Sequence, residues 1–153
     1  MQLRFFGRHE WGAKNPLRAH HDRAHTNYDL QIPVKCVIFG YTQSQPCYEI
    51  EHCKQCIRDI QKRNMEKYQL LDIRYNFLID YLGNKYIGRG WKTMPSLPKK
   101  YRQYQRKSLY VGLIGFYNAQ SPPSPEMYKA KEQLLKAGVR KGEISLKFLE
   151  FNI

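Results

Sequence analysis

The most reactive side chains in the sequence are four cysteines, Cys36, Cys47, Cys53 and Cys56. Cys47 and Cys53 are close enough in the chain to close a small disulfide loop. Cys53 and Cys56 form a C-x-x-C pair, but a structural zinc site needs a second pair at matching spacing, and a thioredoxin-like pair begins its helix rather than lying one turn inside it. These residues favour a structural disulfide between Cys47 and Cys53, with reduced core thiols or a metal site as the alternatives.

A second group of potential metal ligands lies near the N-terminus. His20, His21 and His25 form an H-H-x-x-x-H pattern, and His21 and His25 would share one face if the segment were helical. The segment has little helical patterning and a basic neighbourhood that repels cations, so a solvated loop is favoured over a metal site. No Ser-His-Asp or Cys-His set can be ordered from the sequence, and it contains no G-x-G-x-x-G motif and no P-loop.

The charge and length of the chain indicate which classes of partner it could bind. The chain has 153 residues, with 26 Lys and Arg against 13 Asp and Glu, a net charge of +13. Such a surface attracts polyanions such as nucleic acid, anionic membrane or acidic cell-wall polymer, or it serves only solubility. Basic residues in 92–107 lie among Tyr101 and Tyr104, which could stack bases, but no nucleic-acid-binding motif accompanies them, so we expect no nucleic-acid partner. No apolar run approaches the roughly 20 residues of a membrane span.

The elements that must position these residues follow from hydrophobic periodicity. Apolar residues spaced by three and four between positions 48 and 67 predict a helix with one buried stripe. Ser124 followed by Pro125 predicts the start of a second helix, which we expect Gly138 to end. The strand-helix-strand order favours a βαβ unit. The remaining expected elements are strands at 32–41, 72–81, 85–88 and 108–115, an exposed basic loop at 92–107, and a short strand in the alternating segment 144–151.

Several separated segments then resemble one family, the peptidoglycan recognition proteins. The matching stretches are Arg8-His-Glu10-Trp11-Gly12-Ala13-Lys-Asn-Pro16 against R-x-E-W-G-A-x-x-P, Asp72-Ile73-Arg74-Tyr75-Asn76-Phe77-Leu78-Ile79 against D-I-G-Y-N-F-L-I, Gly83 to Trp91 against G-N-V-Y-E-G-R-G-W, and Ser108 to Gly115 against S-I-G-I-S-F-I-G. The resemblance implies an α/β fold with a mixed central β-sheet packed by helices, as in type 2 N-acetylmuramoyl-L-alanine amidases. It also implies the Cys47–Cys53 disulfide, since the C-x5-C spacing matches one that the family carries.

The resemblance implies domain limits as well. It gives an N-terminal segment at 1–7, the recognition-protein-like domain at 8–143 and a divergent C-terminal tail at 144–153. Family domains continue through a G-H-R-D segment into a final helix, so we expect the C-terminal part of the fold to be missing. That loss would leave an apolar face, which the tail or a partner subunit would cover.

Departures from the family pattern bear on catalysis. Amidase members hold zinc with two His and one Cys, and the metal activates a water molecule. The first His position is occupied here by Gly40, and residues 143–153 contain no His or Cys. Tyr75 matches the family's active-site tyrosine but would have no metal-bound water to assist. The resemblance therefore implies a pseudoenzyme without cofactors, similar to non-catalytic insect members of the family.

Ligand recognition is altered as well. Thr42, Tyr75, Arg89 and Trp91 remain at positions that line or support the family's groove, although Tyr75 and Trp91 could instead serve only packing. Pro95-Ser96-Leu97 replaces a family G-A-H, and Gln69-Leu70 replaces the Gly-Trp of members that prefer diaminopimelic peptides.

These features predict a non-catalytic domain of innate immune recognition or its regulation. It would act mainly through contact with other recognition proteins or immune receptors, with weak or no binding of peptidoglycan fragments. The alternatives are a peptidoglycan-binding sensor and, less favoured, a zinc amidase. The resemblance places the chain outside the cell or in a receptor ectodomain. The sequence printed above contains no signal peptide or transmembrane segment, which leaves an intracellular isoform as an alternative.

Overall fold

The computed structural model describes residues 4–17 and 28–153, so the histidine cluster at positions 20–25 lies outside the described residues. The described residues build a mixed six-stranded sheet in the order β1-β4-β3-β5-β2-β6, in which only the β3–β4 pair is antiparallel. The strands are β1 Phe5–Phe6, β2 Val34–Tyr41, β3 Phe77–Ile79, β4 Lys85–Ile87, β5 Ser108–Leu113 and β6 Ile144–Asn152.

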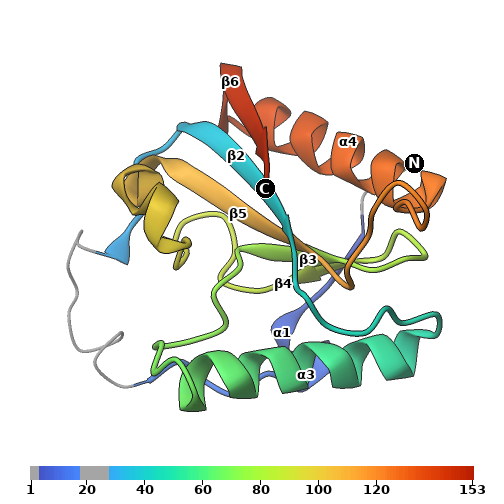
Figure 1. Cartoon of the computed structure of the whole chain (residues 1–153). Helices are drawn as coiled ribbons and strands as arrows, with labels where there is room; N and C mark the ends of the chain where they lie inside the picture. Colours follow the sequence, from blue (N-terminus) through green and yellow to red (C-terminus); the bar gives the residue numbers. More distant parts are fainter. Residues whose placement is uncertain (1–3, 18–27) are drawn as a thin grey trace.

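Helices cover both faces of this sheet (Figure 1). The short α1 (Arg8–Trp11) and the long α3 (Ile50–Glu66) lie on one face, and α4 (Pro125–Arg140) lies on the other. Strand β2 is buried on both sides because its side chains alternate: Ile38 joins the core under α3, whereas Val37 and Phe39 join the core under α4. The expected fold, a mixed central sheet packed by helices, is confirmed. No helix among the described residues is long and apolar enough to cross a membrane.

The sequence signals of both long helices are confirmed, with two adjustments. The Ser124 hydroxyl accepts a hydrogen bond from the Met127 amide at 3.1 Å, and Pro125 is the first helical residue. The helix does not end at Gly138, as the glycine suggested, but continues to Arg140. Gly138 is needed inside the helix because a Cβ there would overlap the Ile144 side chain. In α3, Cys53, Ile57 and Ile60 are buried as expected, whereas Ile50 at the first residue is exposed.

Two other expectations differ from the structure. The strand expected over 72–81 is confined to Phe77–Ile79, because the Asn76 amide takes over hydrogen bonds at its start. Asn76 Oδ1 accepts from the Tyr110 amide at 2.8 Å, and its Nδ2 donates to Gly90 and Thr93 carbonyls at 2.9 and 2.7 Å. The basic segment 92–107 is not all loop, since Lys99–Lys107 forms the 3-10 helix η2. Tyr101 and Tyr104 of η2 pack against Phe151, which fixes this segment on the sheet.

The C-terminal segment is part of the sheet. Residues 144–152, expected as a divergent tail with a short strand, form the nine-residue edge strand β6 parallel to β2. The Ile153 amide continues the pairing by donating to the Phe39 carbonyl at 2.8 Å. Phe151 packs against the core beneath the strand, but Leu146 and Leu149 stay 81% and 61% exposed. Strand β6 thus extends the sheet and leaves apolar side chains on its surface.

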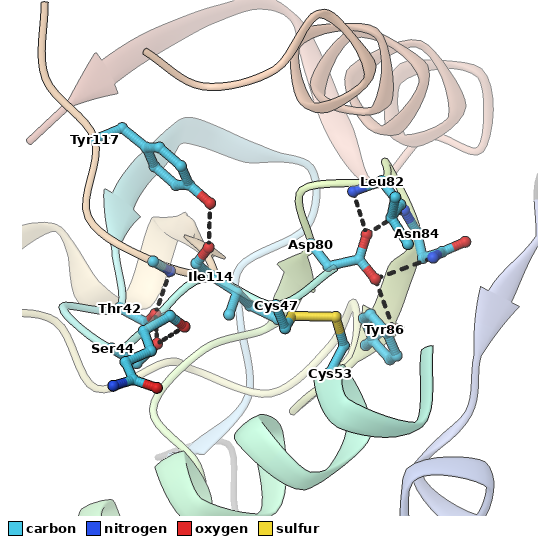
Figure 2. Close-up of a disulfide and its surroundings, with 12 residues drawn as sticks. Thr42, Ser44, Cys47, Cys53, Asp80, Leu82, Asn84, Tyr86, Ile114 and Tyr117 are labelled. Atoms are coloured by element: carbon cyan, nitrogen blue, oxygen red, sulfur yellow. Dashed lines mark hydrogen bonds between the residues drawn. A yellow bond between two sulfur atoms is a disulfide. The ribbon is translucent and has the colours of Figure 1, made fainter. Parts of the chain in front are cut away.

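A disulfide and a buried carboxylate fix the loops on the α3 side of the sheet (Figure 2). Cys47 and Cys53 are bonded, which confirms that pairing, and they join the segment after β2 to the first turn of α3; Cys36 and Cys56 are free thiols. Nearby, the buried Asp80 carboxylate accepts hydrogen bonds from the Leu82 and Asn84 amides at 2.9 Å, from Asn84 Nδ2 at 3.0 Å and from the Tyr86 hydroxyl at 2.8 Å. These bonds shape the tight β3–β4 turn.

We expect Asp80→Ala to lower the free energy of unfolding by about 3 kcal/mol, because it leaves several buried donors without an acceptor. Urea denaturation followed by circular dichroism measures this loss. The matched control is Asp59→Ala on the exposed face of α3, which we expect to change stability by less than about 0.5 kcal/mol. Equal effects of the two substitutions would contradict the assigned role of Asp80.

Candidate ligand groove

A pocket of about 460 Å³ opens between α3 and the C-terminal end of β2. Strands β2 and β5 are parallel neighbours, and the end of β2 supplies the pocket residues Gly40, Tyr41 and Thr42. Such crevices at strand ends are common ligand sites in α/β folds. The lining is completed by Gln43, Ile60, Arg63, Asn64, Tyr68, Arg74, Tyr75, Pro98, Tyr110 and Ile153.

Two buried tyrosines meet in this pocket. The rings of Tyr75 and Tyr110 lie 4.7 Å apart between centroids. Burial raises the pKa of both phenols above the ordinary value, that of Tyr75 very strongly. Tyr75 lies directly over Gly112, where a Cβ would come within 2.9 Å of its ring. At neutral pH both groups are therefore uncharged hydrogen-bonding groups rather than bases.

The space beside Gly40 is already filled. A Cβ at this position would come within 3.1 Å of the Tyr110 hydroxyl oxygen and 3.3 Å of Ile153 Cγ1. A longer side chain at position 40 would have to displace one of these neighbours. Among the described residues, no group of three or more His, Cys, Asp or Glu side chains could hold a metal ion.

Thr42 is the second groove candidate that the structure places in the pocket. Its Oγ1 accepts a hydrogen bond from the Gly115 amide at 3.0 Å and shares one with the Ser44 hydroxyl at 2.7 Å, as Figure 2 shows. These bonds join the ends of β2 and β5. Thr42 therefore holds the pocket wall in shape and has a limited capacity for further hydrogen bonds.

Arg89 and Trp91, the other two groove candidates, do not line this pocket. Arg89 donates from Nε to the Ile73 carbonyl at 2.6 Å and from Nη1 to the Met94 carbonyl at 2.8 Å, and burial lowers its pKa to about 10. Trp91 lies in the core under α4, with its ring 4.6 Å from that of Phe77. In this structure Arg89 fixes loops and Trp91 packs the opposite core, so a direct groove role for them stays a prediction.

The lining residues that sequence reasoning missed include the polar residues Arg63, Asn64, Tyr68 and Arg74. Arg63 and Asn64 come from the last turns of α3, and Tyr68 follows that helix. Arg74 occupies a glycine position of the D-I-G-Y-N-F-L-I pattern, which is the one sequence signal that could have found it. The lining thus carries two arginines and no Asp or Glu side chain, so its side chains favour an anionic ligand.

Comparisons with known proteins agree with this geometry. The family model described as N-acetylmuramoyl-L-alanine amidase matches residues 30–148. The chain is 34% identical over 143 residues to peptidoglycan-recognition protein LC of Drosophila melanogaster. That match covers 94% of this chain and 26% of the Drosophila protein. It is 30% identical over 139 residues to peptidoglycan recognition protein 4 of Mus musculus. That match covers 91% of this chain and 34% of the mouse protein. The chain therefore spans about a quarter to a third of the length of these two relatives.

Solved structures of peptidoglycan recognition proteins are also similar to this chain. The ectodomain of the Drosophila transmembrane receptor PGRP-LCa superposes with a TM-score of 0.85 at 32% identity, covering 96% of this chain and 83% of that chain. Peptidoglycan recognition protein LE, solved in complex with tracheal cytotoxin, a monomeric diaminopimelic acid-type peptidoglycan, superposes with a TM-score of 0.84 at 30% identity. That match covers 97% of this chain and 81% of that chain.

The raised pKa of Tyr75 predicts a pH dependence of stability. Above pH 10 the unfolded chain loses the Tyr75 proton while the folded protein keeps it, so stability falls as pH rises. We expect the free energy of unfolding of the wild type to fall about 1.4 kcal/mol per pH unit more steeply than that of Tyr75→Phe between pH 10.5 and 12. Urea titrations at several pH values measure the slopes, which should be parallel below pH 9. Parallel slopes above pH 10.5 would contradict the burial of a neutral phenol.

Proposed function

The chain belongs to the peptidoglycan recognition proteins, a family built on the N-acetylmuramoyl-L-alanine amidase fold, and we propose that it is a non-catalytic member that acts in innate immune recognition or its regulation. The observation that carries this proposal is Gly40, which stands at the first zinc-ligand position implied by the family resemblance. Glycine offers no side chain to a metal ion.

The surroundings of Gly40 support the absence of catalysis. Amide hydrolysis in this family's manner needs a metal-activated water molecule. Here the Tyr110 hydroxyl and the Ile153 side chain pack where a ligand at position 40 would begin. Tyr75 is held as a neutral phenol, and no Asp, Glu or His side chain lines the pocket to act as a general base in its place.

Contact with another protein is the first proposed mode of action. The edge strand β6 presents Leu146 and Leu149 to solvent, and an exposed strand edge with apolar side chains is a common docking surface. The proposed partners are other recognition proteins or immune receptors. Since one structural relative is a receptor ectodomain, we also propose that this domain works outside the cell.

Binding of peptidoglycan fragments is the second candidate, and the pocket favours it. A relative of the same fold has been solved with a diaminopimelic acid-type peptidoglycan fragment. The pocket here is open and bears two arginines, which suits the carboxylates of a peptidoglycan stem peptide. In this mode the protein would be a sensor that binds its ligand without cleaving it.

The non-catalytic proposal predicts no release of free amino groups from peptidoglycan, whether or not zinc is added. Amine labelling of the soluble products measures release, and titration calorimetry with zinc measures metal affinity. We expect Gly40→Ala to leave the zinc affinity unchanged, because position 40 offers the metal no ligand in either variant. Zinc-dependent amine release would overturn the proposal.

The contact mode predicts that Leu146→Lys with Leu149→Lys weakens association with a recognition-protein ectodomain from the same source by at least about tenfold, since it places charge in an apolar contact. Both side chains are exposed, so stability should change by less than about 1 kcal/mol in total. Biolayer interferometry measures affinity, with Lys62→Ala on α3 as the control. Unchanged affinity in the double variant would remove β6 from the interface.

A further inference from the structure

We propose that Arg74 forms a carboxylate-binding subsite in the groove, which makes the domain selective for acidic peptides. This inference rests on the second candidate function, ligand binding in the groove, and names the ligand group that the groove selects. It concerns a residue that lies at a family glycine position and outside the set of groove residues implied by the resemblance.

The backbone of Arg74 is fixed from both sides. Its amide donates to Asn64 Oδ1 of α3 at 3.0 Å, and its carbonyl accepts from the Ser96 amide at 3.0 Å. Asn64 is itself buried in the helix, so the start of the Arg74 side chain is held at a set place between α3 and the loop before η2. Such anchoring lowers the entropy that ligand binding would otherwise cost.

The guanidinium group of Arg74 is positioned but incompletely bonded. Its Cζ lies 5.3 Å from the centre of the Tyr68 ring, a cation–π arrangement that orients the planar fork. Its Nε is buried, yet among the described residues no hydrogen-bond acceptor reaches that atom. A buried charged donor without an acceptor is costly. A shift of the side chain that brings Nε to the groove would let a ligand carboxylate accept from Nε and a neighbouring Nη, which would remove this cost.

The rest of the groove fits the same ligand. Arg63 adds a second positive charge to the lining, and no Asp or Glu side chain of the lining competes for either guanidinium. The Arg74 charge also acts on the Tyr75 and Tyr110 phenols, which places it close to the pocket floor. A peptide could therefore lie over the two neutral phenols with one carboxylate on Arg74. Peptidoglycan stem peptides carry such groups, which links this subsite to the proposed sensor function.

The test compares a muramyl peptide that has free side-chain carboxylates with its carboxamide analogue, titrated calorimetrically into the full chain. We expect the acid form to bind about tenfold more tightly to the wild type, as a bidentate charged pair requires. Arg74→Lys keeps the positive charge but loses the two parallel N–H donors of the guanidinium group. The preference for the acid peptide over the amide peptide should therefore fall to about twofold or less. The control Lys129→Gln removes one exposed charge from α4, on the other face of the sheet, and should keep the tenfold preference.

Several results would overturn the subsite. Equal binding of the acid and amide peptides to the wild type would be one, and an undiminished preference in Arg74→Lys would be another. The same loss of preference in Lys129→Gln, or no binding of either peptide, would also count against it. Competition by inorganic phosphate as strong as by the acid peptide would also overturn it, because it would show a general oxyanion site. Near-UV circular dichroism verifies that the variants are folded.

The same samples separate this inference from the proposed function. Chromatography of the peptides after titration detects any cleavage of the lactyl-amide bond. Cleavage would refute the non-catalytic proposal whatever Arg74 does. Intact peptides together with no binding would refute the subsite and leave the protein-contact mode standing.

Discussion

The burial of β2 on both faces is the constraint on which the rest of the structure depends. Alternation along the strand sends Ile38 toward α3 and Val37 with Phe39 toward α4, so neither helix layer could be removed without exposing apolar surface. Its neighbours β5 and β6 both run parallel to it, so the C-terminal ends of the three strands lie at the same edge of the sheet. The chain leaves the sheet at this edge after β2. The groove opens at that end.

Close packing then decides what the groove can do. Gly40 and Gly112 give Tyr110 and Tyr75 room to lie on the strands, and burial keeps both phenols neutral. Because the phenols and Ile153 occupy the floor, the chemical character of the pocket comes from its wall. The wall carries Arg63 and Arg74, so electrostatics favours binding an anion over activating a water molecule.

The loops that frame the sheet depend on buried polar groups. Asp80 shapes the β3–β4 turn, and Asn76 joins β5 to the segment that carries Trp91. Arg89 fixes the same region by donating to backbone carbonyls. Each of these side chains satisfies groups that would otherwise be buried without partners, which explains why short strands suffice at this side of the sheet.

The sequence by itself determined strands β2, β4 and β5, both long helices, the Ser124 cap, the family and, through the family's C-x5-C spacing, the disulfide. These depend on local periodicity and on motifs of contiguous residues. It also singled out Gly40, Thr42 and Tyr75. Only the tertiary structure decided that Arg89 and Trp91 turn away from the pocket, that Arg74 lies on Tyr68, and that residues 144–152 form an edge strand. Those outcomes depend on which face of the sheet a side chain meets and on partners distant in the chain, and local patterns do not contain that information.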